Sequence, residues 1–209
     1  MEWDLVLSFL TIGNISIPEI WVAFLLASFL SPLVIRIIER NSIESWYWNV
    51  LLIYFISWKF SYILFNFDMF IDMPLSVIYF NGGDSGHILA VTIITIYMAL
   101  IAFKKNPKVH KDAGSIFLLF FITLELAMNL LEKNFFQSYL NVFVFIALLV
   151  LLILNKKRQK FPLTHWLILL SMVELLVMSF SHSMITIQPI TFIWISSFLI
   201  FSTFKNTEG

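Results

Sequence analysis

The segment Asn81–Leu89 places residues of several types that could do chemistry within a few positions of one another. It combines three glycines with a carboxylate, a hydroxyl and an imidazole, at the start of the apolar run Ile88–Phe103. Glycine permits positive φ angles and close backbone approach, and the N–H groups at the start of the next helix favour an anion such as a phosphate. The imidazole titrates near neutral pH and could act as a general base. The candidate residues are Gly82, Gly83, Asp84, Ser85, Gly86 and His87.

Each of these residues also has a structural interpretation. His87 could be a helix-end histidine satisfied by backbone or water, and we favour a capping role for Asp84 or Ser85 over nucleophilic catalysis. The chain has no cysteine, which excludes thiolate nucleophiles and disulfides. Its four histidines lack the spacing of metal ligands. The sequence therefore predicts neither a metal site nor a cofactor.

Ionisable residues also fall inside long apolar stretches, where they are functional candidates because burying a charge in lipid is costly. Lys59, Glu125 and Glu174 lie at one predicted depth, roughly 9–10 Å below the outer surface at ~1.5 Å per residue. Asn129 shares the helix face of Glu125. We expect Lys59 to pair with Glu125, Glu174 or both, as a structural ion pair or as the polar floor of a phospholipid headgroup pocket. Four polar residues should line the rim: Glu19, His87, His182 and Gln188.

The composition indicates the environment that holds these groups. Hydrophobic residues make up 60% of the 209 residues and charged residues only 12%, whereas a soluble domain has about half and a quarter. We therefore expect an integral membrane protein. The acidic N-terminal residues Met1–Asp4 lack the positive charge of a cleaved signal peptide.

A membrane-crossing helix needs ~20 mostly apolar residues, and seven stretches of the chain meet this condition. The sequence therefore predicts an all-α, polytopic fold with seven transmembrane helices in a single domain over residues 1–209. The predicted spans are Pro18–Ile38, Trp46–Phe65, His87–Phe103, Gly114–Leu131, Ser138–Leu154, Leu163–Ser181 and Ile187–Phe204.

The positions of Lys and Arg predict the orientation, because short cytoplasmic loops retain them. Basic residues gather in every second loop and after the last span, whereas the intervening loops hold only Lys133. We therefore expect the N-terminus outside and the C-terminus in the cytoplasm. The basic loops should contact lipid headgroups and not nucleic acid, because no recognition motif accompanies them. The outer segment Asn66–Gly86 mixes apolar and acidic residues and should lie along the outer membrane interface.

Several short segments are similar, in order along the chain, to segments of one known family. They are Ile12–Ile17, Lys59–Phe65, Met73–Leu75, Asn81–His87, Phe136–Tyr139 and Ile185–Gln188. Through them the chain resembles the prolipoprotein diacylglyceryl transferase family. These bacterial seven-span enzymes move diacylglycerol from phosphatidylglycerol onto the lipobox cysteine of a prolipoprotein. His87 matches the essential histidine of the family's Gly-Gly-Leu-Ser-Ile-His-Gly-Gly signature.

The resemblance implies a multi-pass protein of the bacterial cytoplasmic membrane, with a role in lipoprotein biosynthesis and His87 as its catalytic residue. Its partners would be a phosphatidylglycerol-like membrane lipid and a prolipoprotein or another membrane protein. The residues implied to hold the lipid headgroup are Lys59, Gly82, Gly83, Asp84, Ser85, Glu125, Asn129 and Glu174.

The chain departs from the family where arginines should hold a phosphate. No arginine occurs in Gly114–Asn134 or Glu174–Ser181, and Lys59 stands where the family has arginine. Arginine makes the strong bidentate phosphate contacts. We therefore expect a diverged member of the family, and the sequence leaves open whether this chain has transferase activity. The alternative is a non-enzymatic partner or scaffold subunit of an envelope complex. A small-solute transporter is less favoured, because the sequence has no inverted repeat.

Overall fold

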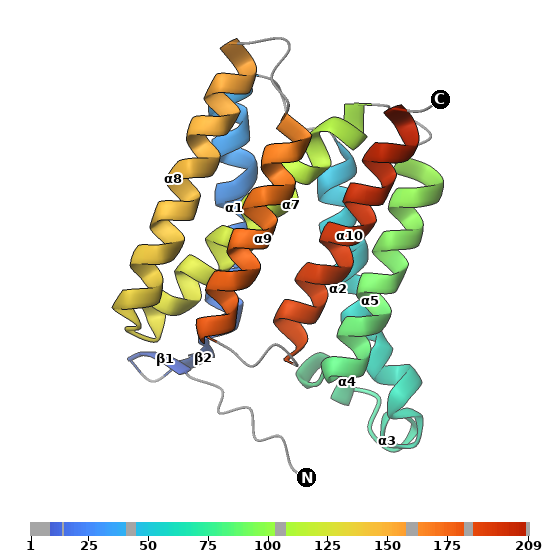
Figure 1. The fold of residues 1–209 in the computed structure, drawn as a ribbon. Helices are drawn as coiled ribbons and strands as arrows, with labels where there is room; N and C mark the ends of the chain where they lie inside the picture. Colours follow the sequence, from blue (N-terminus) through green and yellow to red (C-terminus); the bar gives the residue numbers. More distant parts are fainter. Residues whose placement is uncertain are drawn as a thin grey trace. The chain divides into compact units, whose positions relative to one another are not determined.

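The computed structural model describes residues 9–13, 15–40, 45–102, 108–157, 163–181 and 186–207, and it is mostly helical (Figure 1). A helix lies at each predicted range: α1 Glu19–Glu39, α2 Ser45–Phe65, α5 Gly83–Tyr97, α7 Lys108–Leu131, α8 Phe135–Lys157, α9 Leu163–Ser181 and α10 Ile187–Thr207. Within the described residues, five of these helices are long and apolar enough to cross a membrane. The other two contain shorter apolar stretches, Thr164–Phe180 and Ile187–Ser202. The number of spans and their orientation stay predictions.

The helix surfaces are apolar, as contact with lipid requires. On α1, Leu25, Phe29 and Ile37 are 57%, 60% and 68% exposed, whereas Ala23 and Ala27 are fully buried. A helix of a soluble protein turns its large apolar residues toward the core and its polar residues toward water. Here small residues face the interior and large apolar residues face outward, which is consistent with a membrane protein.

Two short strands precede α1, a feature that the all-α prediction missed. β1 (Phe9–Ile12) and β2 (Ile15–Pro18) pair antiparallel, with Phe9 opposite Pro18 and Ile12 opposite Ile15. Gly13, which follows β1, has a φ of +62°, a conformation that glycine adopts without steric cost. The dipeptide Gly-Asn between two mostly apolar runs is a hairpin signal that the sequence already contained.

The chain forms two compact units. Unit 1 comprises residues Met1–Ser42 and Ala113–Pro189, and unit 2 comprises Ile43–Asp112 and Ile190–Gly209. Unit 1 therefore holds the hairpin, α1, most of α7, α8 and α9. Unit 2 holds α2, α5, most of α10 and two short helices, α3 (Phe67–Asp72) and α4 (Ser76–Tyr79).

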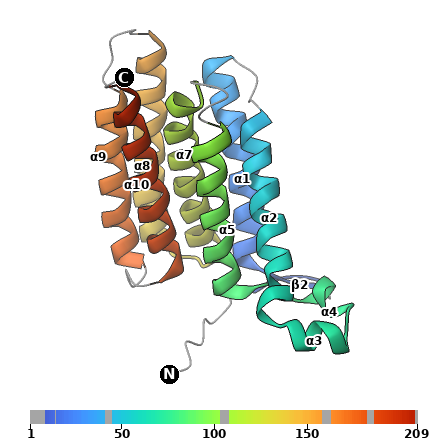
Figure 2. The same ribbon diagram turned by 90° about the vertical axis from the view of Figure 1, so that its right-hand side faces the viewer.

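In unit 1, α8 and α9 lie side by side, and α1 contacts α8 (Figures 1 and 2). The rings of Phe24 on α1 and Phe120 on α7 meet edge to face, with centroids 5.6 Å apart. At the other end of α1, Lys156 of α8 donates a hydrogen bond to the carbonyl of Ile38. Apolar packing and one charged contact thus join α1 to α7 and α8.

In unit 2, α2 and α5 lie side by side along their length (Figures 1 and 2). Asn49 Nδ2 of α2 donates to the Tyr97 hydroxyl of α5 over 3.2 Å. Trp194 Nε1 of α10 donates to Thr95 Oγ1 of α5 over 3.2 Å. Helix α5 continues as one π-helical turn, η1 (Met98–Ala102). These polar links tie three helices together within the apolar surroundings.

Candidate functional site

The glycine-bearing turn before α5 lies against α2 at very short distance. Gly82 N donates to Trp58 O over 3.2 Å, and Ser61 Oγ donates to the same carbonyl over 2.7 Å. A Cβ atom on Gly82 would lie 1.8 Å from Ser61 Oγ, and one on Gly86 would lie 2.2 Å from it. Side chains at these two positions would collide with α2. The glycines therefore serve close helix packing, the use that small residues have in membrane proteins.

Helix α5 begins at Gly83, one turn before the predicted start at His87. Gly83 has a φ of +57°, and its N–H group donates to Asn81 Oδ1 over 2.9 Å. Asp84 and Ser85 consequently lie exposed inside the first turn, and the helix has no side-chain cap. The predicted capping role of Asp84 or Ser85 is therefore wrong, because the N-cap position falls on Gly82, which has no side chain.

His87 is held through both ring nitrogens. Its Nδ1 is hydrogen-bonded to the Tyr54 hydroxyl at 2.7 Å, and its Nε2 to Thr191 Oγ1 at 2.7 Å. The Tyr54 ring also meets the imidazole edge to face, at 5.7 Å and 78°. In a neutral imidazole one nitrogen donates and the other accepts, and a hydroxyl can play either role. Residues of α2, α5 and α10 thus fix the orientation of a half-buried imidazole.

The sequence reasoning missed both partners of His87. Tyr54 belongs to a stripe on α2 that continues with Trp58, Ser61 and Tyr62 at helical spacing, and this polar and aromatic face was a usable signal. Thr191 is the fifth residue of α10, two residues after Pro189, and nothing in its local sequence singles it out.

Lys59 makes its contacts with the main chain. Its Nζ donates to Ile78 O over 2.8 Å and to Phe80 O over 2.9 Å, so the ammonium ties the segment around α4 to α2. The predicted carboxylate partners, Glu125 and Glu174, belong to unit 1. The predicted ion pair between Lys59 and these residues stays a prediction.

The predicted site residues of unit 1 are deeply buried. Glu125 and Asn129 are each 1% exposed and Glu174 is fully buried. Asn129 Nδ2 donates to Glu125 O over 2.9 Å. Glu19, predicted on a rim, is buried as well, and His182 lies outside the described residues.

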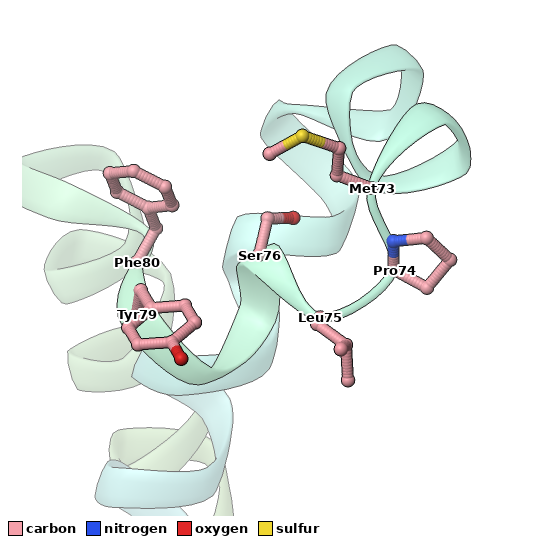
Figure 3. Close-up of a pocket in the computed structure, with 6 residues that line it drawn as sticks. All are labelled: Met73, Pro74, Leu75, Ser76, Tyr79 and Phe80. Carbon is pink, nitrogen blue, oxygen red and sulfur yellow. The ribbon is translucent and has the colours of Figure 1, made fainter.

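An apolar groove of about 510 Å³ opens in the segment before α5 (Figure 3). In Figure 3 the rings of Tyr79 and Phe80 lie on one side of Ser76, and Met73, Pro74 and Leu75 on the other. Tyr79 is 80% exposed and Leu75 is 70% exposed, whereas the Phe80 ring stacks on Tyr62 at 5.7 Å. This surface fits the predicted placement of Asn66–Gly86 along a membrane interface.

Among the described residues, no group of three or more His, Cys, Asp or Glu side chains could hold a metal ion. Comparison of the chain with protein-family models, with curated proteins and with solved structures finds no match. The site must therefore be interpreted from its own geometry.

Proposed function

We propose that the chain is a diverged relative of the prolipoprotein diacylglyceryl transferases that handles a phospholipid or a lipidated protein in the bacterial cytoplasmic membrane. In this proposal seven helices cross the membrane, with the N-terminus outside and the C-terminus in the cytoplasm. The observation that carries the proposal is the fixed imidazole of His87, held by Tyr54 and Thr191 in the helix that begins three residues after the apolar groove.

The groove suits the acyl chains or the glycerol backbone of a lipid. Its lining is apolar, and the segment around it exposes one large apolar residue after another to the surroundings. These residues are Phe67, Met69, Ile71, Met73, Leu75, Ile78, Tyr79 and Phe80. Monomeric soluble proteins rarely expose such a contiguous apolar patch, which typically marks a membrane or ligand contact.

His87 would supply acid–base chemistry to a lipid held there. Its imidazole would accept the proton of a substrate thiol while the sulfur attacks a glyceryl carbon and the headgroup glycerol phosphate leaves. Tyr54 and Thr191 would keep the ring aimed at the thiol. Without the family's arginines, less charge faces the departing phosphate, so we expect transfer to be much slower than in the family.

Lipid retention tests the proposal. The purified protein would be delipidated, offered equal amounts of phosphatidylglycerol and phosphatidylethanolamine, and examined by native mass spectrometry. We expect phosphatidylglycerol to be retained, and Tyr79→Ser in the groove to reduce retention severalfold. Phe143→Ser is the matched control, because Phe143 is a comparably exposed ring on α8 (72%). Equal retention by the two variants would refute a lipid role for the groove.

Transfer itself is tested in a strain depleted of its own transferase. Maturation of a prolipoprotein that depends on this chain and is abolished by His87→Ala would establish the transfer reaction. The sidedness is tested with Ser85→Cys, because the natural chain has no cysteine and Ser85 is exposed. A membrane-impermeant maleimide should label that variant from the outside of intact cells.

One observation favours a second candidate, a non-enzymatic partner or scaffold subunit of an envelope complex. Both nitrogens of His87 and the ammonium of Lys59 already bond within unit 2, as structural residues do. This candidate predicts that a partner co-purifies with the chain and that His87→Ala lowers stability without changing the phenotype.

A further inference from the structure

Unit 1 contains a cluster of buried polar atoms that lack hydrogen-bond partners among the described residues. Its members are Glu19, Gln137, Asn141 and Glu174, which are 8%, 4%, 1% and 0% exposed. The atoms are Glu19 Oε2, Gln137 Oε1, Asn141 Oδ1 and Nδ2, and both carboxylate oxygens of Glu174. Buried polar atoms are bonded in the great majority of cases, so each exception needs an explanation such as an absent ion or water.

The helices bring these residues to one end of unit 1. The turn between α7 and α8 makes Glu125 and Asn141 level with each other, because Glu125 lies six residues before Leu131 and Asn141 six residues after Phe135. Glu174 lies seven residues before the end of α9 at Ser181, and α8 and α9 lie side by side with opposite directions, so Glu174 is level with Asn141. Glu19 is the first residue of α1, and Figures 1 and 2 show that the start of α1 and the end of α9 lie at the end of unit 1 where α7 meets α8.

The chemistry of the cluster specifies the charge of its ligand. Oxygen acceptors without partners number five, one each from Glu19, Gln137 and Asn141 and two from Glu174, against one donor, Asn141 Nδ2. Within the described part of unit 1, the one basic residue at this end is Lys133, which is exposed. Buried carboxylates require a counter-charge or a proton. An anion would be repelled, whereas a cation would satisfy the oxygens.

We propose that Glu19, Gln137, Asn141 and Glu174 form a binding site for one monovalent cation. Carboxylate and amide oxygens are the ligands that hard cations prefer. Since no group of three acidic or histidine side chains gathers in the described residues, a single positive charge fits better than a divalent ion. The charge could come from a free ion such as Na⁺ or from the ammonium group of a lipid headgroup. The site uses no residue of the His87 region and does not depend on the proposed function.

Thermal unfolding of the purified full chain in detergent tests this site. NaCl, or ethanolamine hydrochloride as an ammonium probe, would replace choline chloride at constant ionic strength. We expect the apparent Tm to rise by several degrees and to saturate with one of the two probes. A free-ion site responds to Na⁺. A lipid-ammonium site responds to ethanolamine, and to phosphatidylethanolamine nanodiscs compared with phosphatidylglycerol nanodiscs. A wild-type Tm that none of these probes changes would overturn the proposal.

Two variants assign the effect to the cluster. Glu174→Gln removes the charge and Asn141→Leu removes the amide. Each should weaken the apparent affinity for the cation, obtained from the saturating rise in Tm, at least about tenfold. In choline alone, both should be at least as stable as the wild type, because Glu174→Gln removes a buried charge and Asn141→Leu removes a buried amide, and neither group has a hydrogen-bond partner among the described residues. Glu39→Gln, at the opposite end of α1, should keep the full shift. Loss of stability in choline by both variants, with the shift intact, would show a structural role and refute the site.

Discussion

Replacing Gly86 with alanine should destabilise unit 2, and replacing Ser61 with alanine in the same chain should remove most of that loss. The new methyl group would lie 2.2 Å from Ser61 Oγ, far inside the ~3.5–4.0 Å separation at which non-bonded heavy atoms attract. Ser61 can move its hydroxyl only by giving up the 2.7 Å hydrogen bond to Trp58 O. Either response costs stability.

The magnitude follows from two opposing contributions. Overpacking of a tight contact costs about 1–3 kcal/mol, and alanine gains about 1 kcal/mol over glycine in a helix. Gly86→Ala alone should therefore lower the unfolding free energy by roughly 0–2 kcal/mol. In a Ser61→Ala background the nearest atoms to the new methyl become Trp58 O at 3.3 Å and the Cβ of residue 61 at 3.4 Å. These contacts are tight by only a few tenths of an ångström, so there the same change should cost much less than in the wild-type background.

Gly82→Ala provides the control. Its Cβ would also lie 2.8 Å from Gly86 Cα, a backbone atom that Ser61→Ala leaves in place, so this variant should stay destabilised in both backgrounds. The assay is a double-mutant cycle on purified protein, unfolded by heat or SDS in micelles. If Gly86→Ala and Ser61→Ala add within ~0.3–0.5 kcal/mol, the close contact between α2 and α5 is not the reason for the glycine.

Three further changes test single contacts. Tyr54→Phe keeps the ring but removes the hydroxyl bonded to His87 Nδ1, so stability should fall by about 1 kcal/mol and the imidazole ¹⁵N shifts should change; unchanged shifts would contradict this bond. Lys59→Met frees two main-chain carbonyls and should cost about 1.5–3 kcal/mol, with faster limited proteolysis near Ile78; wild-type resistance would show that the tether is unimportant. Lys133 has a φ of +58°, in the left-handed region of the backbone. Lys133→Gly should therefore relieve about 1–2 kcal/mol of backbone strain and raise the Tm. A lower Tm would refute this reasoning.

Much of the helical framework could be predicted because apolar stretches of sufficient length are a direct physical signal. Helix α9 has the predicted bounds, Leu163–Ser181, and α10 begins at the predicted Ile187. The start of α5 was misplaced because glycines predict a loop from local propensity alone. In the structure, the contact of Gly82 and Gly86 with Ser61 outweighs that propensity. Tertiary packing decides such a boundary.

The surroundings of His87 could be predicted only in part. The sequence singled out the imidazole itself, but its partners come from helices far away along the chain, 33 residues for Tyr54 and 104 for Thr191. Helical periodicity tells which residues share one face of one helix, and it carries no information on which faces meet. The sequence analysis did not single out the buried amides Gln137 and Asn141 as site residues, because uncharged residues in an apolar stretch resemble ordinary packing residues.

The bond from Lys59 to the carbonyls of Ile78 and Phe80 bears on the biogenesis of the protein. Helix α2 has a mean hydropathy of 1.3, and the span Gly83–Leu100, which contains α5, has one of 1.4; these are the lowest values among the five candidate membrane spans within the described residues. If α2 entered the bilayer alone during synthesis, its ammonium would meet lipid at a cost of about 2.5–3.5 kcal/mol, because its acceptors would not yet have been synthesised. We expect α2 to remain at the translocon until α5 has been synthesised. The two helices would then insert into the bilayer together, as a helical hairpin.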